Sequence, residues 1–272
     1  MSRIVPGDFR VRRNQSAPRN AFKGCGHGDN AVTLACWATN SLVPELASRR
    51  LDIAEIRPID SKILQMPKNA PERRIITVGV AGASGAIYAQ TLLRLLDADK
   101  RVEHVFLVAS DAGLRLVASE LNIVAADTKK QLPALLTGTA AKKIEYLPNK
   151  DIGASIASGS AAVDAMVVIP CSAGALGVIA AGIANDLLTR AADVCLKERR
   201  PLVLCLRETP LNRIHLENML RVHDAGATVM PAMPAFYYEP KSIADTVDQF
   251  CCRVLAQLGL PQEKQYRWKG KP

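Results

Sequence analysis

The sequence predicts an α/β protein built on a doubly wound, mostly parallel sheet with helices on both faces. Short apolar runs alternate with amphipathic segments after residue 73, an order typical of βα units. A glycine-rich turn follows the first apolar run, as in both flavodoxin-like and Rossmann-like folds. Aromatic residues make up only 4% of the chain, which suits aliphatic helices layered on a sheet. Both of these fold types remain open at this point.

The first βα unit lies in residues 74–96. Residues 75–80 form an apolar, β-branched run typical of a strand buried on both faces. Glycines at every third position from 79 to 85 mark a turn, and a helical period begins at Ala86. Such a turn can bind a small phosphate ligand through free backbone N–H groups. It can equally be a tight turn without a ligand.

The remaining elements follow in order along the chain. Strands are predicted at 102–108, 143–147, 165–169, 202–206 and 228–230. Helices are predicted at 111–121, 173–184, 186–199, 211–225 and 242–258. Ser110 or Asp111 would begin the first of these helices, and Gly259 would end the last. Residues 1–73 are assigned to a basic N-terminal extension and linker, and residues 74–272 to the catalytic domain.

Polar residues gather where predicted strands end, namely Ser84, Ser110, Ser172 and the pair Arg207–Glu208. In open α/β sheets this carboxyl edge is where ligands bind, so we expect these residues to meet in one crevice. An arginine there can hold a phosphate with two hydrogen bonds, and a carboxylate at an apolar rim suits proton transfer. The alternative is that these are ordinary loop residues and that Arg207 and Glu208 form a surface ion pair.

Two further groups of polar residues carry weaker signals. Arg190, Asp193 and Lys197 share one face of a predicted helix, which fits a solvated charged surface. His215 and His223 follow on a later helix without a recognisable nucleophile beside them, and helix-face histidines are more often structural than catalytic.

The charge distribution favours small anionic ligands over nucleic acid. The net charge is +9, and residues 1–73 hold 12 Lys and Arg against 7 Asp and Glu. A basic surface of this kind is either solvated or attracts phosphorylated molecules. No basic stripe interleaved with aromatics indicates nucleic-acid binding, and no apolar run is long enough to cross a membrane.

The seven cysteines contain no C-x-x-C pair, and several lie in apolar runs. They are therefore expected to be free thiols of a reducing compartment, and we expect a cytoplasmic protein. Cys25, His27 and Cys36 lack a fourth ligand and make a poor zinc site. No metal is expected.

Several separated motifs resemble one family, the UbiX-type flavin prenyltransferases, a phenylacrylic acid decarboxylase-like flavoprotein family. The resemblance covers about residues 74–268. The motifs are Gly82-Ala-Ser-Gly-Ala-Ile-Tyr88, Ser158-Gly-Ser160, Val168-Ile-Pro-Cys-Ser172, Leu188-Thr-Arg-Ala-Ala-Asp-Val194, Lys197-Glu-Arg-Arg-Pro-Leu202, Arg207-Glu-Thr-Pro-Leu211, Ile214-His-Leu-Glu-Asn-Met-Leu220 and Pro234-Ala-Phe-Tyr237.

The resemblance implies a flavodoxin-like sheet in a homo-oligomer, typically a dodecamer, with active sites at subunit interfaces. It implies prenyl transfer from dimethylallyl phosphate to reduced FMN, without a metal. The prenylated FMN would serve a UbiD-type decarboxylase, in ubiquinone biosynthesis or in aromatic acid decarboxylation.

The resemblance also implies site residues. FMN would be bound by Gly82, Ala83, Ser84, Ser110, Ser172, Ala173, Gly174, Ala175 and Arg207. The prenyl phosphate would meet Lys197, Arg207, Tyr237 and Arg253, with Glu120 reaching in from a neighbouring subunit and Arg190 as a further basic residue. Glu208 would transfer the proton, so that Glu208, Lys197 and Arg207 form the catalytic set.

Two departures from the family pattern stand out. Ala161 replaces a usual aromatic residue, and Ala173-Gly174-Ala175 replaces a bulkier Met-Lys-Thr or Met-Gly-Thr turn. They leave open a larger prenyl donor or weaker activity. Two other functions also remain open: an aromatic acid decarboxylase, which would need a histidine beside the flavin, and a non-catalytic flavin carrier.

Overall fold

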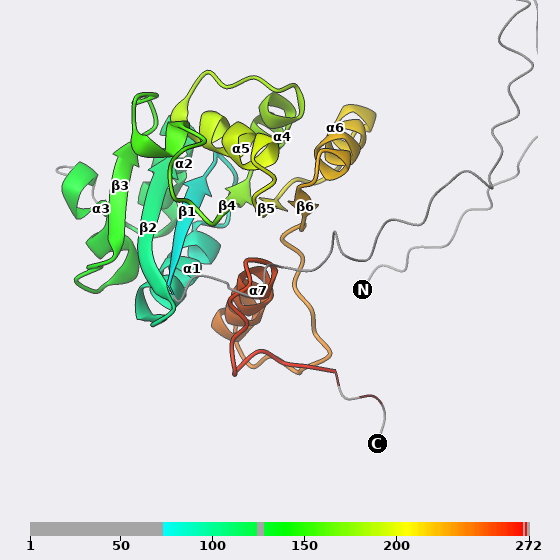
Figure 1. Ribbon diagram of the computed structural model, residues 1–272. Coiled ribbons are helices and arrows are strands. Elements are labelled where there is room, and N and C mark those ends of the chain that lie inside the picture. Colours follow the sequence, from blue (N-terminus) through cyan, green and yellow to red (C-terminus); the bar gives the residue numbers. More distant parts are fainter. Residues whose placement is uncertain (1–72, 124–127, 269, 271–272) are drawn as a thin grey trace, which may run out of the picture. The chain divides into compact units, whose positions relative to one another are not determined.

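The computed structural model describes residues 73–123, 128–268 and 270, which all belong to one compact unit. Figure 1 shows their arrangement as a central sheet with helices on either side. Residues 1–72 lie outside the described part, so the predicted extension and the Cys25–His27–Cys36 group are not described. None of the described helices combines the length and the apolar character of a membrane span.

The sheet has six strands in the order β3-β2-β1-β4-β5-β6, and every neighbouring pair is parallel. The strands are β1 (Arg74–Val80), β2 (Val102–Ala109), β3 (Ile144–Pro148), β4 (Ala165–Cys171), β5 (Leu202–Leu206) and β6 (Thr228–Val229). This confirms the doubly wound parallel sheet. The strand order is that of the Rossmann fold rather than of flavodoxin, which decides between the two types that the sequence left open.

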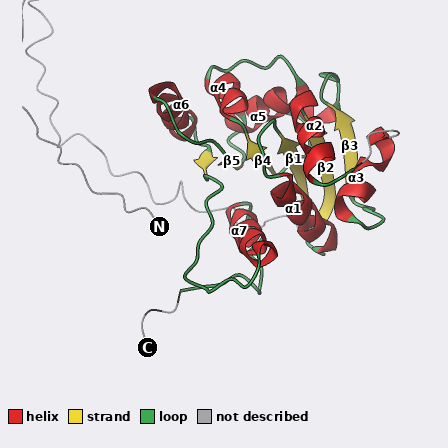
Figure 2. Cartoon of the chain, turned by 180° about the vertical axis from the view of Figure 1, so that it is seen from behind, coloured by secondary structure: helices red, strands yellow, loops and turns green. Residues whose placement is uncertain are grey.

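Helices cover both faces of the sheet, as Figures 1 and 2 show from opposite sides. They are α1 (Ala86–Ala98), α2 (Asp111–Glu120), α3 (Thr128–Thr137), α4 (Ala173–Ala180), α5 (Leu187–Lys197), α6 (Arg213–Asp224) and α7 (Ile243–Gln257), with a short 3₁₀ turn η4 (Ser155–Ala157). One core lies between the sheet and α1, α3 and α7. A second core lies between the other face and α4, α5 and α6. Strands sandwiched in this way are mainly apolar, as predicted for β1, which is buried from Ile76 to Val80 and has Thr77 as its one polar residue there. Strands β4 and β5 are buried along their whole length.

The differences from the predicted elements have local causes. Helix α3 was not predicted because Pro133 lies inside it, and proline usually breaks a helix interior. Strand β4 runs through Pro170 to Cys171, because an irregularity in its pairing with β5 after Val168 accommodates the proline. Helix α4 ends at Ala180 instead of 184, since Gly182 takes a left-handed conformation with φ of 67°.

Candidate active site

A crevice opens between the ends of β1 and β4, which are neighbours in the sheet. The chain leaves β1 toward the face covered by α1, and it leaves β4 toward the face covered by α4. Such a switch point is where open α/β sheets bind ligands. The cavity there has about 290 Å³, and its wall includes Gly82, Ser110, Ser172 and Ala175. Four of the predicted cofactor-binding residues therefore come together, and Ala83, Ser84, Ala173 and Gly174 lie in the same two turns.

Two helices begin at this cavity. The Ser110 Oγ accepts a hydrogen bond from the Gly113 N–H at 3.0 Å, and the Ser172 Oγ accepts one from the Ala175 N–H at 3.2 Å. Ser110, not Asp111, is therefore the N-cap of α2, and Ser172 is that of α4. The first turns of both helices carry N–H groups and a partial positive charge that favour an anionic or polar ligand.

Gly82 lets the first residues of α2 pack closely against the turn after β1. A Cβ atom at Gly82 would lie 2.5 Å from the Cβ of Ala112, a distance that real side chains do not reach. Close packing of this turn against α2 therefore requires a glycine at position 82. Gly85 has φ of 118° as the N-cap of α1, a conformation that favours glycine.

The start of α5 completes the wall, with Asn185, Asp186 and Thr189. Sequence reasoning did not assign these residues to the site. The Asp186 carboxylate accepts from the Thr189 N–H at 2.9 Å, and the two residues form a reciprocal capping box. An acidic residue three positions before a threonine at a helix start resembles a capping-box signature. That pattern could have placed Asp186 at the carboxyl edge of the sheet.

The N-terminus of α1 is occupied by Glu120 of the same chain. Its carboxylate accepts from the N–H groups of Gly85 at 2.9 Å and Ala86 at 2.8 Å. Burial raises the pKa of Glu120, but these hydrogen bonds, one from Ser84 and the charge of Arg207 outweigh it and hold the pKa below its usual range. The resemblance placed Glu120 in a neighbouring subunit's site, whereas here it binds its own glycine turn. An anion at this end of the crevice would meet a carboxylate rather than free N–H groups.

Arg207 and Glu208 follow β5 at the same edge. The Arg207 Nε donates to the Ser84 carbonyl at 3.1 Å, and the Arg207 N–H donates to the Cys171 carbonyl at 2.9 Å. Arg207 thus links the turns after β1, β4 and β5. Glu208 is exposed, and one carboxylate oxygen accepts only from the Thr209 N–H. No ion pair between Arg207 and Glu208 is present, so the surface ion-pair alternative is wrong.

A second cavity of about 410 Å³ begins at Arg207 and Glu208. Its other walls are mainly apolar and include Leu211 before α6, Met219 on α6 and Ala232 after β6. Glu208 thus stands at the rim of an apolar cavity, as predicted. An apolar wall beside a cation and a carboxylate suits a ligand with a flat or hydrocarbon part and a charged end.

Lys197 lies elsewhere, whereas Arg190 is in the first turn of α5, next to Thr189 of the crevice wall. Helix α5 begins at the carboxyl edge, where the Leu187 N–H donates to the Asn149 carbonyl just after β3, and it ends at Lys197. A helix of 11 residues is about 16 Å long at 1.5 Å per residue. Within one chain Lys197 is therefore at the amino edge, far from Glu208.

Helix α5 and the residues that follow it contact the loop that precedes β4. The Lys197 Nζ lies 2.5 Å from the Glu198 carboxylate, and the Arg200 side chain donates to the Gly159 carbonyl at 2.6 Å. Arg190 donates to the Ala157 carbonyl at 3.0 Å and pairs with Asp193 at 2.8 Å. Arg190 thus holds the Ser158-Gly-Ser160 loop onto α5, and its predicted substrate contact stays a prediction.

Tyr237 and Arg253 form a third group beside α7. Tyr237 lies in the segment between β6 and α7, and Arg253 is on α7 itself. Both side chains are exposed and line a small cavity together. The predicted site residues therefore form three groups in one chain: the carboxyl-edge crevice, the amino-edge loop with Lys197, and the Tyr237–Arg253 pair.

The described histidines lie outside both large cavities. His215 takes part in the cap of α6 with Asn212, and His104 pairs with Glu145 at 3.1 Å. The carboxyl-edge crevice of the described chain thus offers Glu208 for proton transfer and no imidazole.

Comparisons with known proteins agree with this arrangement. Residues 64–251 match the Flavoprotein family model. The chain is 45% identical over 203 residues to the flavin prenyltransferase UbiX of Pseudomonas aeruginosa, covering 74% of this chain and 95% of that one. It is 42% identical over 193 residues to UbiX of Methanocaldococcus jannaschii, covering 71% and 97%.

The chain belongs to the UbiX-type flavin prenyltransferase family.

Two solved structures of this family are similar in fold. AnUbiX (PadA1) in complex with FMN and dimethylallyl pyrophosphate is 38% identical with a TM-score of 0.64, covering 74% of this chain and all of that one. A dodecameric FMN-dependent UbiX-like decarboxylase from Escherichia coli O157:H7 is 40% identical with a TM-score of 0.65, covering 72% of this chain and all of that one. The family resemblance drawn from the motifs is confirmed.

Proposed function

We propose that this chain transfers a dimethylallyl group from dimethylallyl phosphate to reduced FMN and releases phosphate. The observation that carries the proposal is the crevice at the β1–β4 switch point, which brings Gly82, Ser110 and Ser172 together beside Arg207 and Glu208. Membership of the flavin prenyltransferase family supports the same reaction. The product is prenylated FMN.

FMN fits the two carboxyl-edge cavities by their chemistry. The helix starts at Ser110 and Ser172 suit a polar or anionic part of the molecule, and the apolar wall beside Met219 suits part of a flat ring system. Arg207 stands between the two cavities, because it binds the Ser84 carbonyl and lines the apolar one. The residues present therefore fit a flavin mononucleotide.

The chain's own residues have two tasks in this reaction. The carbon–oxygen bond of the donor breaks, and phosphate leaves with the bonding electrons, so cations at Arg207, Arg253 and Lys197 stabilise the leaving group. Reduced flavin supplies the electron-rich nitrogen and carbon that receive the prenyl group. Glu208 at the rim of the apolar cavity moves the proton that ring closure requires.

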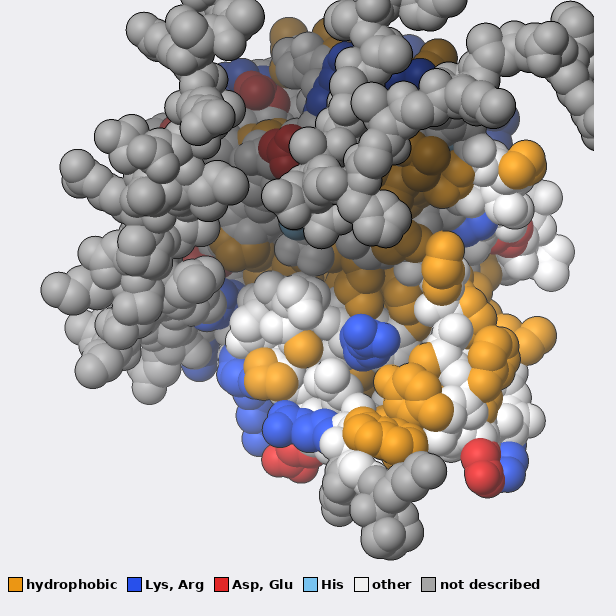
Figure 3. Space-filling view, turned by 90° about the vertical axis from the view of Figure 1, so that its right-hand side faces the viewer, with side chains coloured by type: hydrophobic (Ala, Val, Ile, Leu, Met, Phe, Trp, Pro, Cys, Tyr) orange, Lys and Arg blue, Asp and Glu red, His pale blue; other side chains and the backbone are white. Residues whose placement is uncertain are grey.

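The full site needs a second copy of the chain, because Lys197 and Glu208 lie at opposite edges of one sheet. Helix α6 supports assembly, since Ile214, Leu216 and Leu220 are 53 to 66% exposed. Met233, Phe236 and Ile243 are also largely exposed, and Figure 3 shows apolar side chains gathered on the face that carries α6 and α7. Patches of this kind mark protein interfaces. We propose a homo-oligomer, a dodecamer as in the Escherichia coli relative.

The proposed product, prenylated FMN, is used by another enzyme. We propose a UbiD-type decarboxylase as the recipient of prenylated FMN, in ubiquinone biosynthesis or aromatic acid breakdown. The five described cysteines are free and buried, which supports a reducing compartment such as the cytoplasm.

Ala161 bears on the choice of donor. It is half-buried against α5 and the amino-edge loop, where the family usually has an aromatic side chain. If that loop meets the crevice of a second copy, the smaller residue leaves room for a prenyl phosphate longer than dimethylallyl phosphate.

The test is anaerobic incubation of the protein with reduced FMN and dimethylallyl phosphate, followed by mass analysis of the flavin. We expect the flavin mass to increase by one dimethylallyl group and phosphate to be released in equal amount. Bound but unmodified flavin would favour the carrier function instead. Release of carbon dioxide from an aromatic acid by the protein alone would favour the decarboxylase.

A further inference from the structure

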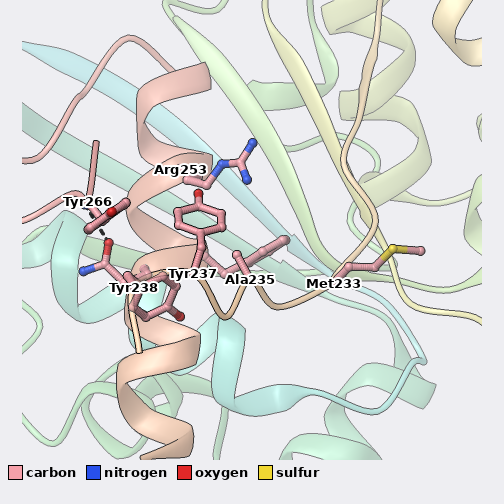
Figure 4. Close-up of a pocket in the computed structure, with 8 residues that line it drawn as sticks. Met233, Ala235, Tyr237, Tyr238, Arg253 and Tyr266 are labelled. Atoms are coloured by element: carbon pink, nitrogen blue, oxygen red, sulfur yellow. Dashed lines mark hydrogen bonds between the residues drawn. The ribbon is translucent and has the colours of Figure 1, made fainter. Parts of the chain in front are cut away.

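A small cavity beside α7 contains two of the residues predicted to meet the donor phosphate, Tyr237 and Arg253. Its walls include Met233, Tyr237, Tyr238, Gln249, Arg253 and Tyr266. The enclosed space is about 20 Å³, roughly enough for one water molecule. A phosphate would therefore lie at the mouth, where Tyr237 and Arg253 are exposed. Figure 4 shows the Tyr237 ring next to Arg253, with Tyr266 on the other side.

Tyr237 is held by aromatic contacts rather than by regular secondary structure. It lies in the irregular segment between β6 and α7, and 52% of it is exposed. Its ring centroid is 5.3 Å from that of Tyr266 and 6.1 Å from that of Trp268, within the range of favourable aromatic pairs. Both partners belong to the segment after α7, which we call the C-terminal strap (residues 260–268). The position of Tyr237 thus depends on the strap.

The strap is itself irregular, and its backbone is bound to α7 by the side chain of Gln249. The Gln249 Oε1 accepts from the Tyr266 N–H at 2.8 Å, and its Nε2 donates to the Lys264 carbonyl at 3.0 Å. A single amide therefore uses its acceptor and one donor to fix two backbone groups of the strap. Gln249 and Arg253 are four residues apart in α7, so they lie on the same face of that helix.

The other attachments of the strap lie away from Arg253. Gln262 donates to the Asp99 carboxylate at 3.0 Å, and Arg101 donates to the Pro261 carbonyl at 3.1 Å, which fixes the start of the strap near the amino edge of the sheet. Lys264 pairs with Asp248 at 2.8 Å on the surface. Among the described residues, the Gln249 attachment is the one that joins the strap to the helix face that carries Arg253.

We propose that Gln249 and Tyr266 are positioning residues for the donor phosphate: Gln249 holds the strap so that Tyr266 keeps Tyr237 beside Arg253. This inference rests on the proposed prenyl transfer. The Tyr238 hydroxyl lies in the same cavity wall, buried and without a hydrogen-bond partner among the described residues. This hydroxyl adds a hydrogen-bond donor beside Tyr237 and Arg253, which already suit an anionic ligand. The ligand class is an allylic phosphate monoester.

The test is steady-state kinetics with dimethylallyl phosphate at saturating reduced FMN. Gln249→Leu removes both hydrogen bonds at similar size, and we expect KM for the donor to rise about tenfold with kcat and FMN affinity unchanged, the pattern of lost uniform binding. Gln249→Glu keeps the acceptor for the Tyr266 N–H, so its KM should lie between that of the wild type and that of Gln249→Leu. Tyr266→Ala should raise KM as Gln249→Leu does, while Tyr266→Phe keeps the ring and the wild-type KM.

Lys264→Met is the matched control, because it breaks only the surface pair with Asp248 and should leave KM unchanged. An unchanged KM in Gln249→Leu would overturn the inference. So would a parallel loss of kcat and FMN affinity, which would indicate a structural defect. Failure of the proposed function is a separate result, since the wild-type protein would then not convert the donor at all.

Discussion

The two edges of the sheet differ in how their site residues are held. At the carboxyl edge, Ser110, Ser172 and Arg207 are fixed by hydrogen bonds to helix starts and to neighbouring turns. At the amino edge, Lys197 ends a helix on the surface, and its described ionic partner is the adjacent Glu198. The first edge is a complete pocket within one chain. The second edge carries a cation, Lys197, for which we propose a ligand bound mainly by another copy.

This difference shows how a family with one sheet builds a two-substrate site. The parallel sheet concentrates helix starts at one edge only, so that edge suits the flavin. Cations for the leaving phosphate must then come from another element, and α5 presents Lys197 at the opposite end. We therefore propose that a second copy brings that end to the crevice.

The largest effect is expected at the carboxyl edge. Glu208→Gln keeps the shape and the hydrogen bond from the Thr209 N–H but cannot move a proton. Formation of the cyclised product should fall about 100-fold or more, the usual scale for a positioned acid–base group, while FMN affinity stays at the wild-type value. The measurement is the absorbance spectrum of the flavin product over time. Wild-type rates in this variant would remove Glu208 from the mechanism.

The amino edge should give a smaller effect of a different kind. Lys197→Met removes one charged hydrogen bond to the leaving phosphate, so kcat/KM for the donor should fall about 10- to 100-fold. FMN affinity should not change, because Lys197 is proposed to contact the donor phosphate and not the flavin. Lys142→Met, an exposed lysine elsewhere, is the control. A loss of FMN affinity in Lys197→Met would place Lys197 in the flavin pocket.

Most of the fold and half of the site follow from the sequence. The carboxyl-edge residues were found because polar residues directly after buried runs must lie at one edge. The position of Lys197 followed from the same rule but was missed: a helix between two parallel strands ends at the amino edge, whereas Arg207 follows a strand. The family motifs placed both residues in a site at a subunit interface without indicating which copy supplies each.

Other features need three dimensions. Nothing in the sequence pairs Glu120 with the N–H groups of Gly85 and Ala86, which are 35 and 34 residues away, respectively. The attachment of the strap by Gln249 depends likewise on how an irregular segment returns to α7. Neither contact has a periodic or motif signal.

Packing at the crevice offers a stability test. Gly82→Ala would place a Cβ 2.5 Å from that of Ala112, and such overpacking costs about 1–3 kcal/mol. Adding Ala112→Gly should recover part of this loss, although glycine in a helix costs about 0.5–1 kcal/mol by itself. Denaturant unfolding of the two single variants and the double variant measures the coupling. Purely additive effects would show that the two atoms do not meet.

The smallest effect is expected in how the folding stability depends on pH through Glu120. Its pKa is lowered in the folded chain, so its contribution to stability is fully present above its ordinary value of 4.5 and is lost as the pH falls through the lower, folded pKa. Glu120→Gln should therefore unfold with a weaker pH dependence below about 4.5 than wild type. Glu103→Gln, at an exposed position, is the control. Equal pH dependence in Glu120→Gln and wild type would contradict the α1 contact.

The central claim is that one active site takes Glu208 from one copy and Lys197 from another. The direct test is to co-express Lys197→Met and Glu208→Gln chains with different tags, purify the mixed oligomers through both tags, and measure prenylated FMN. With random mixing, about a quarter of the sites should combine an intact carboxyl edge with an intact amino edge, so activity should rise far above that of either variant alone. Mixed oligomers no more active than the single variants would show that both residues act within one chain, in contradiction to the fold described.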